Sequence, residues 1–217
     1  WSSGKVQKLD DIKANQLLKL AEKDAVDRLQ PASPGIKWFT EIQSGIKYES
    51  RDTSINDFNR QALLISEFSY QGPCMVKYDL DKDGLEDVLI GAAPGQATNL
   101  FMQQKNGAFV KKIIPVFEFD KAYADADINI FDANADSFPD IYIASGGYND
   151  LSASDSLLND RLYLNDGKNN FARSKGLPAM SSSKSCVRIE DVNGDGSPDI
   201  FVGGRVVPGR YPETPQS

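Results

Sequence analysis

The chain of 217 residues contains no histidine. This absence removes the commonest general base, the commonest zinc ligand and every nucleophile pair that relies on an imidazole. Cysteine is scarce, because Cys74 and Cys186 are the only two and cannot build a disulfide framework. No apolar run approaches the roughly 18–20 residues of a membrane span. Together these absences exclude histidine-based hydrolases, zinc modules that need histidine and small disulfide-stapled folds.

Positive charge is also limited. The chain has 24 Lys and Arg against 31 Asp and Glu, a formal net charge of −7, and no basic cluster longer than Lys111-Lys112. A nucleic-acid partner needs a basic face, so we expect none. The composition is that of a globular protein, with 40% hydrophobic residues. The chain opens with "WSSGKVQKLDD", without a secretory leader or an initiator Met, and we expect it to be a piece of a longer protein.

An acidic nine-residue motif occurs three times. "DLDKDGLED" begins at Asp79, "DANADSFPD" at Asp132 and "DVNGDGSPD" at Asp191, and all three fit D-x-[D/N]-x-D-x-x-x-D. Short β-branched runs precede and follow each motif, as in "INIF" before and "IYIASGG" after the second. Each motif is therefore predicted to be the tight loop of a β-hairpin.

A second hairpin follows the first two motifs. "LFMQQKNGAF" from Leu100 and "LYLNDGKNNF" from Leu162 share a Leu-aromatic start, a turn-rich middle and a final Phe. Each repeat unit then has about four antiparallel strands, the size of a propeller blade. The sequence thus predicts an all-β fold, a partial β-propeller of about three four-stranded blades.

The acidic loops have the residue pattern of calcium sites. Ca²⁺ takes six to eight oxygen ligands, and carboxylates at alternate positions of a tight loop can converge on one ion. The predicted side-chain ligands occupy positions one, three, five and nine, with a backbone carbonyl from position seven. They are Asp79, Asp81, Asp83, Asp87 and the carbonyl of Leu85; Asp132, Asn134, Asp136, Asp140 and the carbonyl of Phe138; and Asp191, Asn193, Asp195, Asp199 and the carbonyl of Ser197. We expect two to three structural Ca²⁺ ions.

The loops differ in ways that rank the sites. Gly84 and Gly196 follow the third carboxylate position in loops one and three, where a left-handed backbone is expected, but loop two has Ser137. Loop two is thus predicted to be the weakest site. The twelfth positions are apolar and the flanks are strands, which excludes an EF-hand. The alternative to a metal is an Asx-rich turn that caps itself with side-chain to backbone hydrogen bonds.

The two cysteines occupy equivalent places in the repeat. Cys74 and Cys186 each lie five residues before the first aspartate of a loop, and Asp127 fills this position in the second unit. The Cα atoms of equivalent positions two blades apart are expected to be separated by more than roughly 7 Å, the limit for a disulfide. We therefore expect two free, mostly buried thiols that pack as small apolar residues.

"YDLDKDGLEDVLIGA", "IEDVNGDGSPDIFVGG" and "RLYLNDGKNNF" resemble the FG-GAP/VCBS repeat family, whose blades carry calcium. The resemblance covers residues 72–207 and implies calcium-bearing propeller blades. A second, narrower resemblance concerns the first residues: "WSSGKVQKLDDIKANQLLKLAEKDA" resembles the tail of an ASPIC/UnbV domain. This resemblance implies that residues 5–22 are largely β-strand. That implication conflicts with the helical spacing of apolar residues over 17–29; we favour strand up to residue 22 and leave 23–30 open.

These resemblances give a domain plan. We expect residues 1–30 to be the tail of an ASPIC/UnbV-like domain, 31–71 a Pro/Gly-rich linker and propeller entry, and 72–217 three blades of an incomplete propeller. Propellers close with about 4–8 blades. A three-bladed piece would expose edge strands, so self-association through an edge is expected.

The implied function is a non-catalytic, calcium-stabilised binding module of a secreted, cell-surface or periplasmic protein, with a protein or glycan as partner. Its insertion at residues 146–161 is a candidate binding loop or an idle surface loop. The alternative is a calcium-dependent polysaccharide lyase that uses Arg205, Arg210 or Tyr211. RNA binding, a third possibility, conflicts with the acidic net charge.

Overall fold

The computed structural model of the protein describes residues 1–26, 39–51, 55–69, 72–215 and 217. The chain divides into two compact units, Trp1–Ile42 and Gln43–Ser217. The boundary expected between residues 30 and 31, and the first residues of the expected linker up to residue 38, lie outside the described residues. Among the described residues, no helix combines the length and the apolar character that crossing a membrane requires.

Residues 1–26 of the first unit contain little regular structure. A single antiparallel β-bridge joins Val6 to Val26 through two backbone hydrogen bonds. One short 3-10 helix, η1, spans Glu22–Asp24. The remainder of this segment consists of turns and extended chain.

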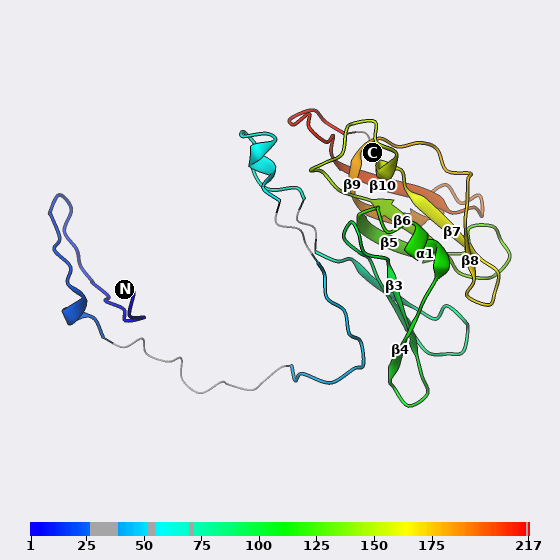
Figure 1. Ribbon diagram of the computed structural model, residues 1–217, viewed down its shortest axis with the longest axis horizontal. Coiled ribbons are helices and arrows are strands. Elements are labelled where there is room, and N and C mark those ends of the chain that lie inside the picture. Colours follow the sequence, from blue (N-terminus) through cyan, green and yellow to red (C-terminus); the bar gives the residue numbers. More distant parts are fainter. Residues whose placement is uncertain (27–38, 52–54, 70–71, 216) are drawn as a thin grey trace. The chain divides into compact units, whose positions relative to one another are not determined.

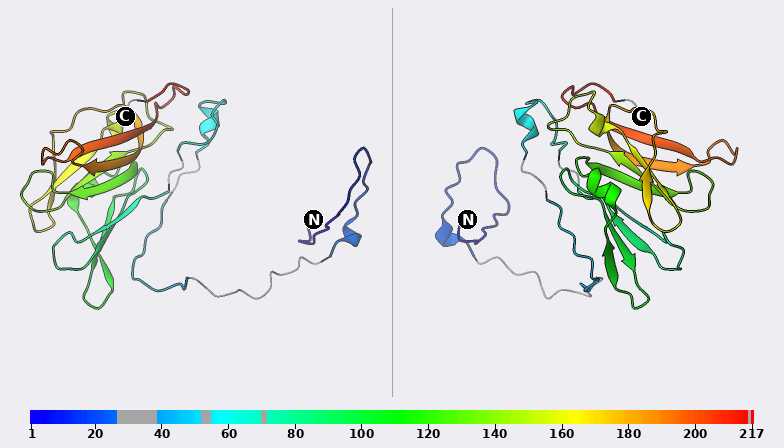
Figure 2. Two further views of the ribbon diagram at one scale, coloured as in Figure 1. Left: turned by 180° about the vertical axis from the view of Figure 1, so that it is seen from behind. Right: turned by 45° about the vertical axis from the view of Figure 1, so that its right-hand side comes forward.

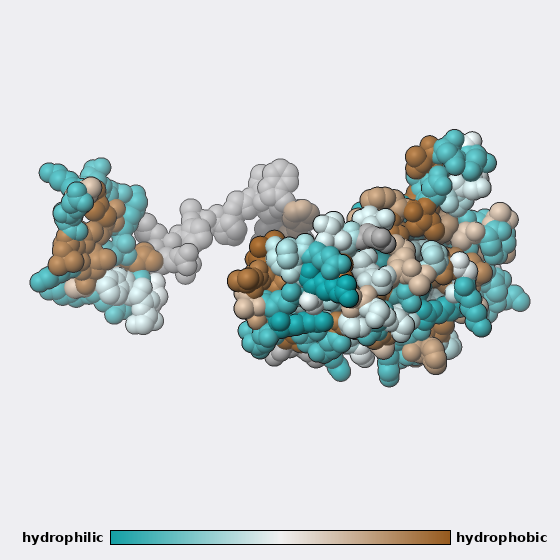
Figure 3. Space-filling view, turned by 90° about the horizontal axis from the view of Figure 1, so that it is seen from above, coloured by the Kyte–Doolittle hydropathy of each residue, from teal (hydrophilic) through white to brown (hydrophobic). Residues whose placement is uncertain are grey.

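The expectations for this segment are therefore wrong. Residues 5–22 do not form strands, and residues 17–26 do not form the helix that their apolar spacing indicates. A strand needs a hydrogen-bonded neighbour, and an amphipathic helix needs a surface on which to bury its apolar face. Among the described residues, this segment pairs only through the Val6–Val26 bridge, and Leu17 is 88% exposed. Figure 3 shows such apolar side chains as the brown surface of the unit at the left.

The second unit contains two four-stranded antiparallel sheets and a hairpin, so the all-β prediction is confirmed (Figure 1). The first sheet has the order β1-β2-β3-β4 and consists of β1 (Met75–Tyr78), β2 (Asp87–Ile90), β3 (Asn99–Gln103) and β4 (Phe109–Lys112). The second has the order β5-β6-β7-β8 and consists of β5 (Asp125–Phe131), β6 (Asp140–Ser145), β7 (Arg161–Asn165) and β8 (Phe171–Arg173). The third pairs β9 (Ser183–Glu190) with β10 (Asp199–Val206).

Two blades thus have the predicted four strands and the third repeat has two. Strands β3 and β4, and likewise β7 and β8, form the outer hairpins expected from the Leu-aromatic repeats. No strand follows β10 among the described residues. A short helix that the sequence did not indicate, α1 (Pro115–Phe119), links the two four-stranded sheets. Two 3-10 turns, η2 (Asp57–Asn59) and η3 (Ser156–Leu158), lie outside the sheets.

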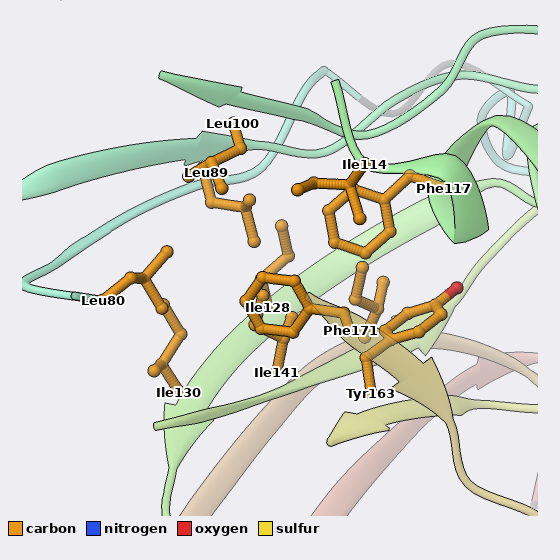
Figure 4. Packing of buried hydrophobic residues seen from close by; sticks show 11 residues of the cluster. Leu80, Leu89, Leu100, Ile114, Phe117, Ile128, Ile130, Ile141, Tyr163 and Phe171 are labelled. Atoms are coloured by element: carbon orange, nitrogen blue, oxygen red, sulfur yellow. The ribbon is translucent and has the colours of Figure 1, made fainter. Parts of the chain in front are cut away.

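The largest apolar core lies between the first and second sheets (Figure 4). Leu89 and Leu100 of the first sheet meet Ile141 of the second, and all three are at most 1% exposed. Phe117 of α1 covers one end of the cluster and contacts the Tyr163 ring edge-on, with 5.1 Å between ring centroids. Each fully buried side chain of this kind contributes about 1.5–3 kcal/mol.

A second core lies between the second sheet and the third hairpin. Tyr142 and Ala144 point away from the first sheet and pack with Val187 and Val202 of β9 and β10. All six residues of β6 are consequently buried. The sheets pack in series, with β5 adjacent to β1 on one side and to β9 on the other (Figure 2). This arrangement is that of successive propeller blades.

Asp125 joins the first two blades. Its Oδ2 atom accepts hydrogen bonds from the Ala92 N–H (2.8 Å) and the Thr98 hydroxyl (2.6 Å) in the first blade. Its Oδ1 atom accepts from the Arg161 guanidinium of the second blade at 2.7 Å, and both side chains are at most 2% exposed. Burial opposes the charge of Arg161, but the Asp125 carboxylate and the Tyr163 side chain together outweigh burial and raise the pKa of Arg161. This buried ion pair was not evident from the sequence.

Two further ion pairs join the second and third blades. Asp127 accepts from the Val187 N–H at 3.0 Å and from the Arg188 guanidinium at 2.7 Å. Asp160 lies 3.3 Å from the Lys184 ammonium, and both side chains are almost fully buried. Burial lowers the pKa of Lys184, although Asp160 acts in the opposite direction. Aspartates therefore link the sheets at both junctions.

The cysteines are free and partly buried, in agreement with the prediction of free, mostly buried thiols. Each lies beside a glycine in, or directly after, the neighbouring strand. Gly91 directly follows β2 and lies beside Cys74, and Gly203 in β10 lies beside Cys186. A Cβ atom added at Gly91 would overlap the Cys74 sulfur, and one added at Gly203 would lie 2.6 Å from the Cys186 sulfur. Burial, followed by the negative charge of Asp125, raises the pKa of Cys74 to about 12. The thiols therefore pack as small apolar side chains, with part of each accessible.

Candidate metal centre

Each acidic segment forms the loop of a hairpin. Residues 79–87 join β1 to β2, residues 132–140 join β5 to β6, and residues 191–199 join β9 to β10. No helix flanks any of the three loops, which agrees with the exclusion of an EF-hand. The three hairpins therefore present equivalent loops to solvent.

The three loops share one hydrogen-bond pattern. In the first, Asp79 accepts from the N–H groups of Asp83 (3.1 Å) and Gly84 (2.9 Å), and Asp83 accepts from the N–H of Leu85 (2.9 Å). The same three bonds recur in the other two loops. Their residues are Asp132, Asp136, Ser137 and Phe138, and Asp191, Asp195, Gly196 and Ser197. These bonds are those of a self-capped turn, and they also fix the orientation of the carboxylates.

The backbone of each loop is left-handed at two positions. The sixth position has φ of +87° at Gly84, +84° at Gly196 and +71° at Ser137, as the glycine pattern indicated. The fourth position is also left-handed, with φ of +59° at both Lys82 and Ala135. The sequence reasoning missed this second position, because only the third loop has a glycine there. Non-glycine residues pay a steric cost in this region, so loop two is the most strained.

Replacing Ser137 by glycine is expected to stabilise the protein by about 0.5–1 kcal/mol, because glycine removes the left-handed strain at a modest entropic cost. Urea unfolding in the presence of a chelator measures the change without any contribution from metal. Ser152→Gly is the control, since Ser152 is an exposed loop serine without a left-handed backbone. It should leave stability unchanged or lower it, and equal effects of the two variants would contradict the strain at Ser137.

The aspartate at the ninth position is a structural link. Both oxygens of Asp140 accept backbone hydrogen bonds, from the N–H of Ala133 in the loop (2.9 Å) and of Asn165 at the end of β7 (2.8 Å). Asp87 makes the same two bonds in the first blade. Both side chains are buried, and burial raises the pKa of Asp87 and of Asp140 despite these hydrogen bonds. The ninth position thus ties the loop to the third strand of its blade.

The third loop lacks this link. Asp199 accepts from the Val192 N–H at 3.0 Å, which corresponds to the first of the two bonds. The second bond would come from a third strand, and none follows β10 among the described residues. Asp199 is accordingly exposed.

The third position separates the first loop from the other two. Asn134 donates its side-chain amide to Asp136 at 2.8 Å, and Asn193 donates to Asp195 at 2.9 Å. These donors compensate the negative charge within loops two and three. The first loop has Asp81 at this position, and a carboxylate has no hydrogen to donate.

As a result, three carboxylates face one another in the first loop. Asp79, Asp81 and Asp83 each offer an oxygen atom, and these atoms all lie within 4.8 Å of one another. Asp81 and Asp83 are exposed and Asp79 is half-buried, so solvent ions can reach the group. Hard oxygen ligands of this kind suit Ca²⁺, and their repulsion falls when a cation binds. The residues present in the first loop therefore fit a calcium ion.

The predicted ligands at positions seven and nine do not belong to this group of three carboxylates. Asp87 is not part of the close group, and its role as a ligand stays a prediction. The N–H groups at position seven, those of Leu85, Phe138 and Ser197, bind the fifth-position carboxylates. The contribution of their carbonyls, and the ranking of loop two as the weakest site, also stay predictions.

The first two loops contact each other. The Lys82 ammonium donates to the Ser137 carbonyl and lies 5.4 Å from the centre of the Phe138 ring. Phe138 in turn covers Gly167 in the outer hairpin, where any added Cβ would lie 2.6 Å from the ring. Lys82 thus couples adjacent loops, a contact that no local sequence signal could reveal.

Comparison with known proteins agrees with this geometry over part of the chain. The family model of the FG-GAP-like repeat matches residues 79–143. These residues form an FG-GAP-like repeat. The repeat begins at the first acidic loop, includes the second and ends within β6. The comparisons give no support for the ASPIC/UnbV resemblance of the first residues, and no curated protein matches the chain.

Proposed function

We propose that the chain is a calcium-stabilised, non-catalytic binding module of a secreted, cell-surface or periplasmic protein, with a protein or glycan as partner. The observation that carries this proposal is the group of three carboxylates, Asp79, Asp81 and Asp83, in the FG-GAP-like repeat. We propose two to three ions in all, with the loop that begins at Asp132 as the weakest site.

A calcium ion would act here as a structural cross-link. Asp79 and Asp83 already hold the loop backbone, so an ion bound to them would secure the hairpin between β1 and β2. Because Lys82 contacts the second loop, ordering of the first loop would extend to the second blade. Exposed sites on hairpins have modest affinity, which suits the millimolar calcium outside cells. This match supports the proposed location.

The residues considered for a lyase reaction have other partners. Arg205 lies 5.1 Å from the centre of the Phe68 ring and donates to the Phe68 carbonyl at 3.3 Å. Arg210 forms an ion pair with Glu213, and Tyr211 packs beside Phe68. These contacts support a packing role for the three residues. A calcium-dependent lyase stays the alternative, and cleavage of acidic polysaccharide that a chelator abolishes would favour it.

Calcium titration by isothermal calorimetry tests the proposal. The chelator-treated protein should bind Ca²⁺, and Asp81→Asn should weaken the tightest site by about tenfold, because one ligand charge is lost. Glu86→Gln is the matched control, since it removes one charge from the same loop at an exposed residue that pairs with Lys77. Absence of calcium binding, or equal weakening by both variants, would contradict a site formed by the three aspartates.

Self-association is proposed for the open edge of the third hairpin. Strand β10 pairs with β9 on one side and has no second partner among the described residues. Ile200 and Phe201 on this strand are 39% and 59% exposed. Exposed edges with apolar side chains favour pairing with another chain.

A further inference from the structure

A cavity of about 490 Å³ lies at the ends of the first two blades. Its walls include the turn after β2 and the insertion after β6, whereas the acidic loops precede these same strands. The cavity therefore lies at the opposite end of the hairpins from the proposed metal sites. Its volume is within the 300–1,000 Å³ typical of small-molecule sites.

Small residues create this space. Ala93 and Gly95 from the turn after β2 and Ala122 and Ala124 from the segment before β5 form one part of the lining. Leu151 from the insertion closes another part and packs over Gly147. Apolar atoms thus make up most of the surface, which suits an apolar ligand body.

Partly buried polar contacts hold the insertion in place. The Arg60 guanidinium donates to the carbonyls of Tyr148, Asn149 and Leu151, the last at 2.7 Å, and thereby fixes the insertion. The Arg60 group also lies 5.2 Å from the centre of the Tyr148 ring. A wall anchored by one charged group on three carbonyls is preorganised, so little ordering is needed when a ligand binds.

A second part of the wall is anchored by a buried carboxylate. Asp57 is fully buried, and it accepts from the N–H groups of Phe68 and Ser69 at 2.6 and 2.7 Å and from the Ser69 hydroxyl at 2.5 Å. Ser69 lines the cavity. The two walls that come from distant parts of the second unit are therefore both fixed by charge-assisted hydrogen bonds.

The charge of the lining is negative. Two aspartates line the cavity, and neither lysine nor arginine is among the described residues that do so. The charge of Asp125 is balanced by Arg161 at 2.7 Å. Asp150 is exposed, and its carboxylate accepts a hydrogen bond from the neutral side-chain amide of Asn149 at 2.9 Å. Its net charge therefore stays available to a cation at the mouth of an apolar cavity.

We propose that this cavity binds a small primary amine on a compact apolar body, with the ammonium group at Asp150 and the body among the alanines. The occupant is a free small molecule, because the space is a pocket of ligand size. This inference does not depend on calcium binding, since the cavity and the acidic loops lie at opposite ends of the strands.

Ligand-observed NMR with three probes of one shape tests the proposal in the intact chain. The probes are 2-phenylethylamine, the uncharged 2-phenylethanol and the anionic 3-phenylpropionate. The amine should bind up to about fivefold more tightly than the alcohol, as expected for one accessible ion pair, and the anion should bind least. Asp150→Asn should remove the preference for the amine and leave binding of the alcohol unchanged.

A blocking variant separates the cavity from the rest of the surface. Ala122→Phe fills the space and should abolish binding of all three probes, whereas Ala108→Phe, at an exposed turn outside the lining, should not. Binding of the amine that persists in Ala122→Phe would overturn the site. Equal binding of the three probes, or binding of none, would overturn the proposed ligand class.

Discussion

Replacing Arg161 by methionine is expected to lower the free energy of unfolding by about 3–5 kcal/mol. The substitution keeps much of the side-chain volume but leaves the Asp125 carboxylate, 2% exposed, without its cation. That carboxylate also accepts from Ala92 and Thr98 of the first blade, so it cannot turn toward solvent without breaking the junction. Urea unfolding with matched m-values measures the loss.

Arg188→Met provides the control for this prediction. Arg188 also pairs with an aspartate at a blade junction, at the same 2.7 Å, but its side chain is 70% exposed. An exposed pair contributes about 1 kcal/mol or less. Adding Asp125→Asn to Arg161→Met should recover part of the loss, because it removes the uncompensated charge and keeps an acceptor oxygen. If Arg161→Met costs no more than Arg188→Met, burial of the ion pair does not hold the first two blades together.

Replacing Asp140 by alanine is expected to cost about 2–5 kcal/mol. The change leaves two N–H donors, those of Ala133 and Asn165, without their acceptors, and each unsatisfied buried donor costs about 1–3 kcal/mol. Thermal or urea unfolding should be measured in chelator, so that any loss of metal binding does not contribute. The expected loss is therefore a property of the metal-free fold.

Asp199→Ala is the matched change in the third loop. Asp199 is exposed and accepts from one backbone donor, that of Val192, so its loss should cost about 1 kcal/mol. An Asp140→Ala effect that appears with calcium and vanishes in chelator would contradict the structural link. In that case the aspartate at the ninth position would act only as a metal ligand and not as a structural link.

The repeat and its loops could be predicted because they are local. The short β-branched runs place the strands, and the spacing of Asp79, Asp81 and Asp83 brings three carboxylates together within one tight turn. Glycine at position six indicated the left-handed backbone, which Ser137 also adopts. Each of these features depends on residues within one hairpin, where sequence distance and spatial distance agree.

The contacts between blades could not be predicted because their partners are far apart in sequence. Arg161 lies 36 residues from Asp125, and Arg60 lies 88 residues from the Tyr148 carbonyl that it binds. No periodic pattern relates such pairs. The prediction of strands in residues 5–22 was wrong for a related reason. A strand or helix forms there only beside a packing or pairing partner, and the sequence of the segment does not specify that partner.

Thermal unfolding of the intact chain, first with excess Ca²⁺ and then with a chelator, tests most directly whether the acidic loops hold a cation. Ligand that binds only the native state adds about 2.7 kcal/mol per site at a concentration 100-fold above Kd, so we predict a Tm about 5–10 °C higher with calcium. Magnesium at equal concentration should give a smaller shift, because it needs stricter geometry. The same Tm in calcium and in chelator would show that the loops are self-capped turns and would contradict the calcium module.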